Sequence, residues 1–442
     1  MKQKWGRILS LALVCAMSGG FYACDEDTAN SVVDDVLDDI ISEVVNDSTL
    51  NSMIDSMIDS ALNSESAEVN SDTNISIEES FEESDEENYD DSAEDSSEDS
   101  QSADDSSSEN GDVEFTDFSV HFLELGNKYT GDCTLIDVGD TEILIDAGSR
   151  KNSATTISSY IKNYCTDGVL EYVIATHADQ DHIAGFVGNS GDPKRTGILY
   201  QYEVETLIQF PMTSKNALTA AGNKSLYGEY LDAVEYAKGN GTAVYTALDC
   251  WNNQNGAQRS YDLGGGVTMN FLYQRYYEES TSDENDYSVC MLLSQGENHY
   301  LFTGDLEKKG EASLVANNDL PKCKLYKGGH HGSPTSSTTT LMSVIQPEIV
   351  CVCCCCGSSE YTSVVENMFP SQAFVDNIAP YTDKVYVTTM AISGGNGYQS
   401  MNGNIVVTTK NGEVSVDCSN NNTLFKDTDW FKANRILPTA WK

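Results

Sequence analysis

The chain has 442 residues, with 70 Asp and Glu against 25 Lys and Arg and a formal net charge of −45 at pH 7. This length allows one large domain with accessory segments. Residues 25–112 hold 31 of the acidic residues and no Lys or Arg, which leaves 39 acidic and 22 basic residues for 113–442. Such charge argues against a binder of long nucleic acid, because that binding draws on Lys and Arg.

The first 24 residues have the composition of an export signal. Three basic residues precede an apolar core at 8–17 that is too short to span a bilayer. Phe21-Tyr22-Ala23-Cys24 resembles the cleavage site of a bacterial lipoprotein. We therefore expect a lipoprotein-type signal peptide over residues 1–24; an ordinary secretory signal is the alternative. The protein would then be exported and anchored on the extracytoplasmic face through a lipid on Cys24, or otherwise secreted.

Residues 25–112 are expected to form an acidic low-complexity tether. Apolar pairs four residues apart, from Val32/Val33 to Met57/Ile58, predict an amphipathic helix within 31–62. Self-association through this helix and residual helix in a plain tether remain equal alternatives. Residues 64–112, rich in Ser, Asp and Glu, bury too little apolar surface to offset chain entropy, so we expect a disordered, extended linker.

A globular domain is expected over residues 113–418, followed by a C-terminal extension at 419–442 with no assignable role. Apolar runs and helical spacing indicate the elements. The predicted strands are 117–125, 133–138, 141–146, 171–176, 242–248, 267–274, 287–294, 299–303, 322–327, 348–356, 386–391 and 403–409. The predicted helices are 153–164, 226–238, 306–317 and about 335–345. Two strand-rich halves with helices favour an α/β fold of two sheets packed face to face.

The stretch Thr176–Gly185 concentrates side chains that bind metal. Four of them fall within six residues, directly after an apolar run that reads as a buried strand, and a helix starts near Ile183. They are His177, Asp179, Asp181 and His182. Imidazole nitrogen and carboxylate oxygen hold divalent ions without thiols. The stretch therefore predicts a metal site, and a polar loop without metal is the alternative.

His177-x-Asp179-x-Asp181-His182 resembles the HxHxDH motif of the metallo-β-lactamase superfamily, with Asp in place of the middle His. This form is similar to the hydrolase domain of the ComEC competence proteins and their stand-alone relatives. Further blocks follow the family's order: 120–126 with Gly131-Asp132, 143–148, 286–289 with 301–305, and 327–333. The resemblance covers about residues 115–417 and implies a four-layer αββα metallo-β-lactamase-like sandwich.

The resemblance also implies roles for the site residues. The metal ligands that it implies are His177, Asp179, Asp181, His182, Asp305 and His330. His177 and Asp179 would hold one ion, and Asp305 would bridge it to a second. His331 would contact substrate or protonate the leaving group, and the reverse order of the His330-His331 pair stays open. Asp181 and His331 are therefore the candidate catalytic residues, acting with a metal-bound hydroxide.

One departure from the family bears on the metal. Many members carry another His between the first motif and the bridging Asp, but only His299 lies between His182 and His330 here. It falls inside a predicted strand, so we interpret it as structural. The first ion would have fewer protein ligands, and we expect one or two divalent ions, Zn²⁺ first and Mn²⁺ as the alternative.

Three further residues are assigned supporting roles. Asp146 ends a predicted strand and would orient a ligand His. Asp132 is a weaker candidate for the same role, because the turn before it is longer than in the family pattern. Ser333 before Pro334 fits an N-cap and the first helical position. A helix N-terminus there would suit a phosphate oxygen, with ordinary capping as the alternative.

The run Cys351-Val352-Cys353-Cys354-Cys355-Cys356 has no CxxC spacing, and adjacent strand residues point to opposite faces. We expect these thiols to pack in the core rather than bind a metal cluster. Besides Cys15 and Cys24 there are 11 cysteines, an odd number in a domain large enough to fold without disulfides. No disulfide framework is therefore expected.

The sequence thus predicts an exported, metal-dependent hydrolase of phosphodiester bonds, ComEC-like, with DNA among the possible substrates. No GxGxxG or P-loop is present, which argues against nucleotide-driven chemistry. A local basic groove for nucleic acid would draw on Lys194, Arg195, Lys324 and Lys327. A small-molecule phosphodiesterase or esterase of the envelope is the enzymatic alternative. A non-catalytic binding or display module on a degenerate scaffold is the alternative from another class; no protein partner can be inferred.

Overall fold

The computed structural model describes residues 115–189, 195–392 and 397–442. The expected signal peptide (1–24) and acidic tether (25–112) lie outside these residues, so both stay predictions, as does the lipid on Cys24. Among the helices of the described residues, none combines the length and apolar character needed to cross a membrane.

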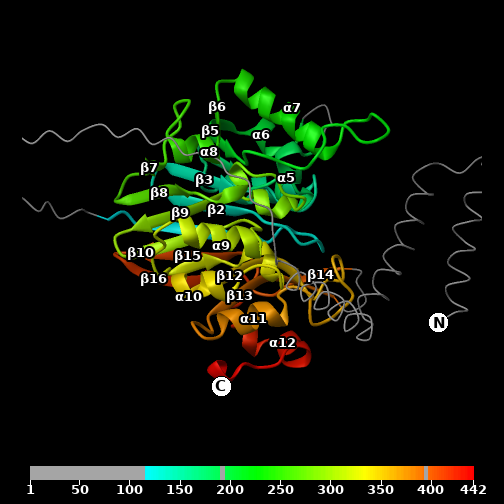
Figure 1. Cartoon of the computed structure of the whole chain (residues 1–442), viewed down its shortest axis with the longest axis vertical. Helices are drawn as coiled ribbons and strands as arrows, with labels where there is room; N and C mark the ends of the chain where they lie inside the picture. The colour runs from blue at the N-terminus through cyan, green and yellow to red at the C-terminus, as the bar shows by residue number, and fades with distance from the viewer. Residues whose placement is uncertain (1–114, 190–194, 393–396) are drawn as a thin grey trace, which may run out of the picture. The chain divides into compact units, whose positions relative to one another are not determined.

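The first of two sheets has eight strands in the described residues, in the order β16-β15-β1-β2-β3-β4-β5-β6 (Figure 1). Its strands are β1 (Phe118–Phe122), β2 (Thr134–Val138), β3 (Thr141–Ile145), β4 (Val169–Ala175), β5 (Glu203–Gln209), β6 (Ala243–Thr246), β15 (Ile405–Lys410) and β16 (Glu413–Cys418). Strands β3 to β6 run parallel to one another, and the other neighbours pair antiparallel.

The second sheet also has eight strands in the described part of the chain, in the order β14-β13-β12-β11-β10-β9-β8-β7. Its strands are β7 (Ser260–Asp262), β8 (Val267–Leu272), β9 (Cys290–Gln295), β10 (Asn298–Phe302), β11 (Leu325–Lys327), β12 (Ile349–Cys356), β13 (Val385–Ala391) and β14 (Tyr398–Ser400). Strands β10 to β13 are parallel, and the remaining pairs are antiparallel.

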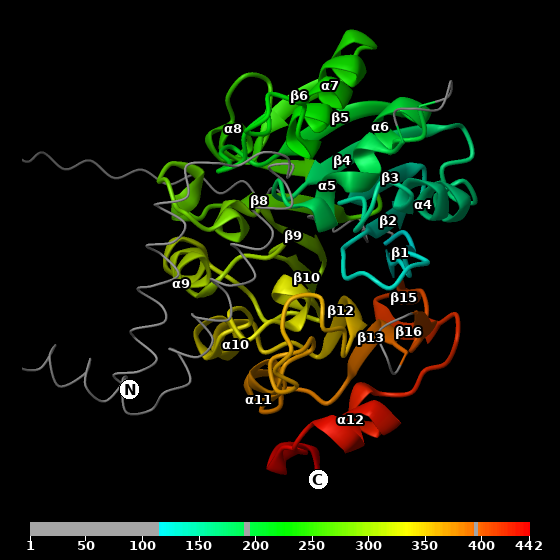
Figure 2. The same ribbon diagram turned by 90° about the vertical axis from the view of Figure 1, so that its right-hand side faces the viewer.

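Helices cover the outer faces of the two sheets. They are α4 (Ser153–Ile161), α5 (Gln180–Val187), α6 (Ile198–Gln201), α7 (Leu226–Gly239), α8 (Ala247–Asn252), α9 (Lys308–Asn317), α10 (Thr339–Ile345), α11 (Gln372–Ile378) and α12 (Asp429–Asn434). Figure 2 shows α9, α10 and α11 on the outer side of the second sheet and α4 on the far side of the first. The predicted α/β class, with two sheets and helices outside, is confirmed.

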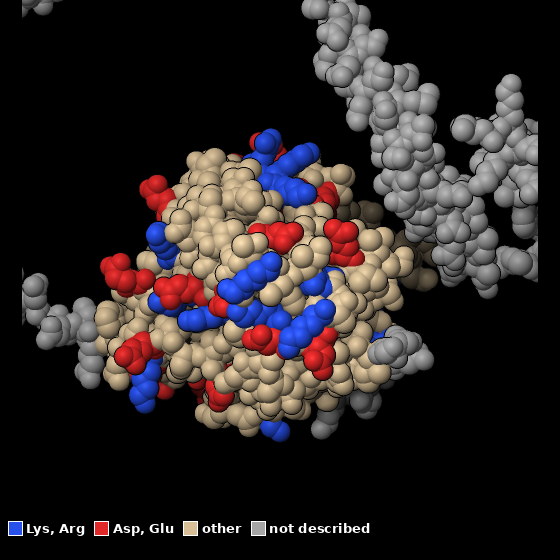
Figure 3. Space-filling model, turned by 90° about the horizontal axis from the view of Figure 1, so that it is seen from below, with Lys and Arg blue, Asp and Glu red and all other residues tan. Residues whose placement is uncertain are grey.

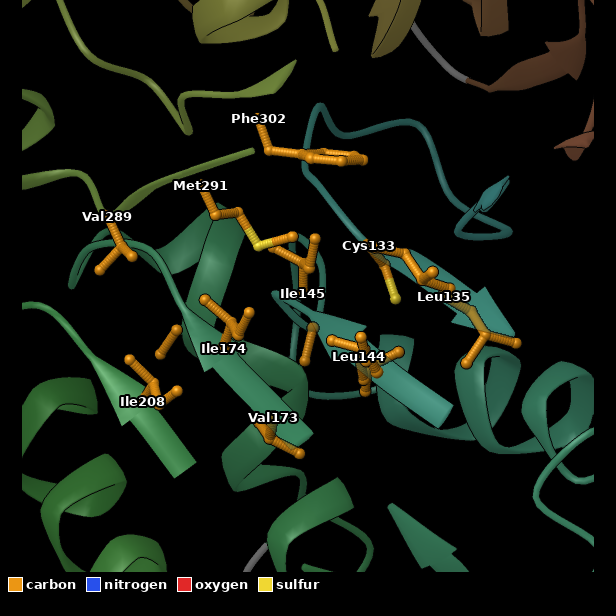
Figure 4. Packing of buried hydrophobic residues seen from close by; sticks show 14 of the residues in the cluster. Cys133, Leu135, Leu144, Ile145, Val173, Ile174, Ile208, Val289, Met291 and Phe302 are labelled. Carbon is orange, nitrogen blue, oxygen red and sulfur yellow. The ribbon is translucent and has the colours of Figure 1, made fainter. Parts of the chain in front are cut away.

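The main core lies between the sheets, where apolar side chains of both meet. Ile145 of β3 and Ile174 of β4 face Met291 of β9 and Phe302 of β10 (Figure 4). All four side chains are buried. Burial of one such side chain contributes about 1.5 to 3 kcal/mol, so this layer fixes the two sheets against each other.

Strand β12 explains the cysteine run. All eight of its residues are buried, because a central parallel strand is covered on both faces. Cys351 and Cys353 belong to the core between the sheets, whereas Cys354 and Cys356 face the helices of the second sheet. Every cysteine in the described residues is a free thiol, in agreement with the predicted packing role.

Residues 419–442 are part of the folded domain rather than an extension beyond it. Phe425, Phe431 and Trp441 are buried in the core that covers the outer face of the second sheet. Trp441 also donates its indole N–H to the Thr382 carbonyl oxygen at 2.8 Å. The sequence boundary at 418 was therefore placed too early, because isolated aromatic residues in a short segment show no periodicity.

Most predicted elements are present with shifted ends, and the differences have local causes. The helix of the metal loop begins at Gln180, three residues before the expected start, with Asp179 as its N-cap. Strand β5 was not predicted; it carries Glu203 and Glu205 on its more exposed face. The helix expected from 335 begins only at Thr339.

Candidate metal centre

The parallel strands of both sheets end at the same edge, and the loops after them carry the predicted site residues. Asp146 follows β3, His177 follows β4, Asp305 follows β10, and His331 follows β11. Gly185 of α5 allows the close approach, because a Cβ there would lie 2.0 Å from the Ala147 carbonyl oxygen. The loop after β3 therefore packs directly on the helix that carries His182.

Four side chains converge at this edge. Nε2 of His182 lies 3.1 Å and Nε2 of His331 lies 3.0 Å from the same oxygen, Oδ2 of Asp305. Nε2 of His331 is also 3.3 Å from Oδ2 of Asp181. His182, His331 and Asp305 are buried. The structure thus brings together residues from three separated motifs.

The donor set of this cluster fits a divalent cation. His331 Nε2 and Asp305 Oδ1 are buried and have no hydrogen-bond partner, which is costly unless another group satisfies them. Two imidazole nitrogens and two carboxylates are a ligand set typical of Zn²⁺ and acceptable to Mn²⁺. We refer to Asp181, His182, Asp305 and His331 as the metal cluster.

Two carboxylates lie behind the histidine rings of the cluster. Asp146 Oδ2 is 2.7 Å from Nδ1 of His182, and Asp132 Oδ1 is 3.3 Å from Nδ1 of His331. Asp132 lies within 4.8 Å of His182, Asp305 and His331, so it belongs to the same group of possible ligands. It lies on the Nδ1 side of both rings, but neither of its oxygens has a hydrogen-bond partner among the described residues, and the Cys353 carbonyl oxygen accepts from Nδ1 of His331 at 2.8 Å. We therefore assign the orientation of the two rings to Asp146 and the Cys353 carbonyl.

Lys327 completes this buried layer. Its ammonium forms an ion pair with Asp132 and lies 3.8 Å from Oδ1 of Asp305. Burial alone would lower the pKa of Lys327, but the charges of Asp132 and Asp305 outweigh it and raise the pKa. Lys327 was expected as a candidate for a basic groove; it is instead buried, so it cannot contact a nucleic acid at the surface.

The charges in the cluster stabilise one another. Burial works to lower the pKa of His182 and His331, but the carboxylate of Asp305 in particular holds both pKa values well above their usual range. Burial works to raise the pKa of Asp305, and the two histidines hold it well below its usual range. The carboxylates are therefore ionised, and a cation that binds the neutral imidazoles must displace protons.

The backbone at the site adopts an unusual conformation. His330 has φ 44° and His331 has φ 54°, both within the short 3₁₀ turn Gly329–Gly332, and Asp146 has φ 59°. Residues other than Gly adopt the left-handed region rarely, and it costs free energy where it occurs. Its concentration at these three residues indicates that the fold holds their side chains in place.

The structure favours the opposite roles for His330 and His331 from those preferred on the sequence. His331 joins the metal cluster, whereas His330 Nε2 is 4.0 Å from Asp305 Oδ2, and Nδ1 lies 3.3 Å from Glu307. The two rings diverge because consecutive left-handed residues turn the chain between them. The geometry therefore favours the reverse order, with His331 as the ligand and His330 at the cleft.

A cleft of about 480 Å³ opens beside the cluster. It is lined by Arg150, Asp179, Gln180, Asp181, Asn285, Asp305, His330, Glu360 and Tyr361. The Tyr361 hydroxyl donates to Oδ2 of Asp181 at 2.7 Å, and Arg150 pairs with Glu360 at 2.8 Å. Arg150, Glu360 and Tyr361 were not assigned from the sequence, since no motif connects positions this far apart.

His177 and Asp179 form a second pair beside the cluster. Nε2 of His177 lies 3.6 Å from Oδ2 of Asp179, and the ring centroids of His177 and His182 are 4.0 Å apart. Oδ1 of Asp179 is 2.5 Å from the Lys215 ammonium. Burial works to raise the pKa of Asp179, but His177 and Lys215 outweigh it and lower the pKa. His177 and Asp179 therefore lie side by side, and Lys215, which was not assigned from the sequence, pairs with the other oxygen of the Asp179 carboxylate.

Ser333 does not cap a helix. Its hydroxyl accepts the Thr335 N–H at 3.2 Å, and α10 begins at Thr339 with Thr338 as its N-cap. The segment between them wraps around the buried carboxylate of Glu311, which accepts the N–H groups of Ser337 and Thr338. The predicted anion site at Ser333 is therefore wrong, because an internal carboxylate already takes these donors.

The remaining candidates lie outside the cleft lining. His299 pairs with Ser294 of the neighbouring strand, in agreement with the predicted structural role. Lys324 pairs with Glu348, and Arg195 packs over Tyr200. Lys194 lies outside the described residues. The basic groove expected from these lysines and arginines is not formed by the described ones.

Two packed sheets, outer helices and a His/Asp cluster at the carboxyl ends of parallel strands define the class: an α/β protein with a candidate divalent-metal centre. Residues 126–188 match the family model of the Metallo-beta-lactamase superfamily. This stretch contains the 177–182 motif and is similar to that superfamily, in agreement with the resemblance seen in the sequence. The match does not distinguish a ComEC-like subgroup. No curated protein matches the chain.

Solved structures that match the chain include the metallo-beta-lactamase fold protein YhfI from Bacillus subtilis, with 11% identity over 63% of this chain and 98% of that chain and a TM-score of 0.34. A HARLDQ-motif mutant of a metallo-beta-lactamase from Cronobacter sakazakii has 15% identity over 47% and 75%, with a TM-score of 0.28. MEM-A1, a subclass B3 metallo-beta-lactamase from a soil metagenome library, has 12% identity over 49% and 78%, with a TM-score of 0.30.

Proposed function

We propose that the protein is a metal-dependent hydrolase of small phosphodiesters. The observation that carries this proposal is the convergence of His182 Nε2, His331 Nε2 and the Asp181 and Asp305 carboxylates at the wall of an open cleft. A divalent cation held by these four residues supplies Lewis acidity and an acidified water at neutral pH. That chemistry suits hydrolysis of phosphodiester and ester bonds.

The chain's own residues prepare the site in three ways. Asp146 and the Cys353 carbonyl oxygen hold the Nδ1 sides of His182 and His331, so both Nε2 atoms face Asp305 Oδ2. Tyr361 holds the Asp181 carboxylate by its hydrogen bond. The Thr335 hydroxyl and Glu307 lie 3.2 and 3.3 Å from Nδ1 of His330, and the His330 ring lines the cleft, where it can give a proton to a leaving oxygen.

The charge distribution favours a small substrate over long nucleic acid. Residues 113–442 carry 39 acidic and 22 basic residues. On the face shown in Figure 3, Lys and Arg side chains are interleaved with Asp and Glu. Long DNA is bound through many lysine and arginine contacts that release counterions, whereas a single phosphodiester needs few. We therefore propose a ComEC-like catalytic centre, but not DNA as its preferred substrate.

A hydrolysis panel with the metal-loaded protein tests this proposal. We expect turnover of bis(p-nitrophenyl) phosphate and cyclic dinucleotides that chelation abolishes and added Zn²⁺ or Mn²⁺ restores, with slower cleavage of linear DNA. His182→Ala should remove both bound metal and turnover. Protein that folds without metal and lacks turnover on phosphodiester and lactone reporters alike would support the non-catalytic display module instead.

The cellular location remains part of the proposal. The basic start, short apolar core and Cys24 favour export as a lipoprotein, with the acidic segment 25–112 as a spacer that carries the hydrolase away from the membrane. Metabolic labelling with a palmitate analogue, compared between wild type and Cys24→Ala, tests it. Label that persists in the variant would contradict the assignment of Cys24.

A further inference from the structure

The Lys215 ammonium pairs with the carboxylate that a second cation would need. Asp179 directs Oδ2 towards His177 Nε2, at 3.6 Å, and Oδ1 towards Lys215 Nζ, at 2.5 Å. His177 Nε2 is buried and has no hydrogen-bond partner. The His177–Asp179 pair, which would hold this second cation, thus already lies beside the fixed positive charge of Lys215.

Glu284 holds the lysine loop against the metal loop. Its buried carboxylate accepts the Ala178 N–H at 3.1 Å, the Thr213 hydroxyl at 2.7 Å, and both the N–H and the hydroxyl of Ser214 at 2.7 Å. One side chain therefore ties the residue before Asp179 to the residues before Lys215. Asp179 pairs with the Lys215 ammonium, and Glu284 fixes the backbone just before Lys215. The position of Lys215 is therefore set by the structure of the site.

No further imidazole among the described residues reaches the His177–Asp179 pair. His121 bonds Ser119 and Tyr160, and His299 bonds Ser294. The other three histidines are His182 and His331 of the metal cluster and His330, which Glu307 holds. Structural and catalytic zinc sites use three or four protein ligands. His177 with Asp179 provides two, and a third would have to come from Asp305, whose Oδ2 already faces both His182 and His331. An ammonium next to Asp179 also repels a cation at that position.

We propose that Lys215 takes the place of a second metal ion, so that the centre holds one divalent cation in the metal cluster with a fixed ammonium beside it. This inference rests on the proposed function, since it assumes that the cluster binds metal. The Lys215 side chain is 39% exposed, so solvent reaches the ammonium that pairs with Asp179.

Metal counting on the full-length protein tests the inference without relying on turnover. The protein is dialysed against excess Mn²⁺. Mass spectrometry then counts the Mn²⁺ ions bound per chain, and electron paramagnetic resonance records their spectrum. We expect one ion per chain and the six-line spectrum of an isolated Mn²⁺. Lys215→Met frees Asp179 and His177, and we expect the count to rise towards two with the spectrum of a coupled pair. Lys215→Arg keeps the charge and should stay at one.

Lys224→Met is the matched control, because Lys224 pairs with Asp232 on the surface and leaves the site intact. It should bind one ion, like the wild type. A wild-type count of two with a coupled spectrum overturns the inference, as does a Lys215→Met count that stays at one. A count of zero in the wild type is a different failure, since it removes the proposed metal centre itself.

Discussion

Nδ1 of His182 lies 2.7 Å from Oδ2 of Asp146, and the same carboxylate accepts the N–H and the hydroxyl of Thr176. Asp146 thus connects the end of β3 to the end of β4 and to the ring that faces Asp305. It aligns the His182 ring before any ligand arrives, because its two oxygens are already bound to the fold.

We expect Asp146→Asn to weaken metal binding by about 10- to 100-fold, since an amide no longer fixes the imidazole as the carboxylate does. Asn is the suitable replacement because it tolerates the positive φ of this position. Competition with a chromophoric chelator gives the affinity, and circular dichroism reports the fold. Unchanged affinity in a folded variant would show that the His182 ring is aligned by other contacts.

Tyr361→Phe removes the hydrogen bond to Asp181 and keeps the ring, which stacks on Phe369 with centroids 5.4 Å apart. We expect kcat/KM on a phosphodiester reporter to fall about tenfold, in line with about 1.5 kcal/mol for a bond to a charged acceptor. Tyr129→Phe is the control, because the Tyr129 ring packs against Arg150. Equal rates for both variants and the wild type would contradict a role for the Tyr361 hydroxyl.

Lys327→Met should lower the free energy of unfolding by about 3 to 5 kcal/mol, because it leaves the buried charge of Asp132 without a partner. Combining it with Asp132→Asn should restore much of the loss. Urea unfolding measures both. Lys324→Met, which breaks a more exposed pair with Glu348, is the comparison and should cost less than about 1 kcal/mol. Additive losses in the double variant would contradict the pairing.

Glu142 predicts a pH dependence remote from the metal centre. Burial raises the pKa of Glu142 from 4.5 to about 7, and the neighbouring Glu171 adds to the shift. The folded state therefore holds a proton that the unfolded chain releases, so this contribution to stability is present below about pH 4.5 and is lost as pH rises through about 7. Glu142→Gln should remove the loss.

Thermal unfolding between about pH 4.5 and pH 8 measures the effect as the difference in Tm between the variant and the wild type. We expect this difference to increase with pH, and subtraction cancels contributions from the metal cluster. Glu413→Gln, at an exposed position of β16, is the control and should give a constant difference. Parallel curves for Glu142→Gln and the wild type would contradict the raised pKa.

Much of the fold followed from local patterns. The strands predicted at 141–146, 171–176, 299–303 and 322–327 lead to the site, and the structure has strands that end within one residue of these positions. Their apolar runs are readable because a strand buried on both faces is continuously apolar. Strand β5 carries Glu203 and Glu205 on its more exposed face, and the aromatic residues after 418 have no periodicity, so neither was predicted.

The sequence by itself determined the residues that could bind metal, since His and Asp at those spacings after buried strands leave few other interpretations. Only the tertiary structure decided their arrangement. It chose His331 over His330, because two left-handed residues turn the rings apart, and it placed Asp132 behind that ring. It also brought Lys215, Glu284 and Tyr361 to the site from separate loops. Such contacts join residues far apart in the chain, and they depend on how the sheets and loops pack, which no local pattern encodes.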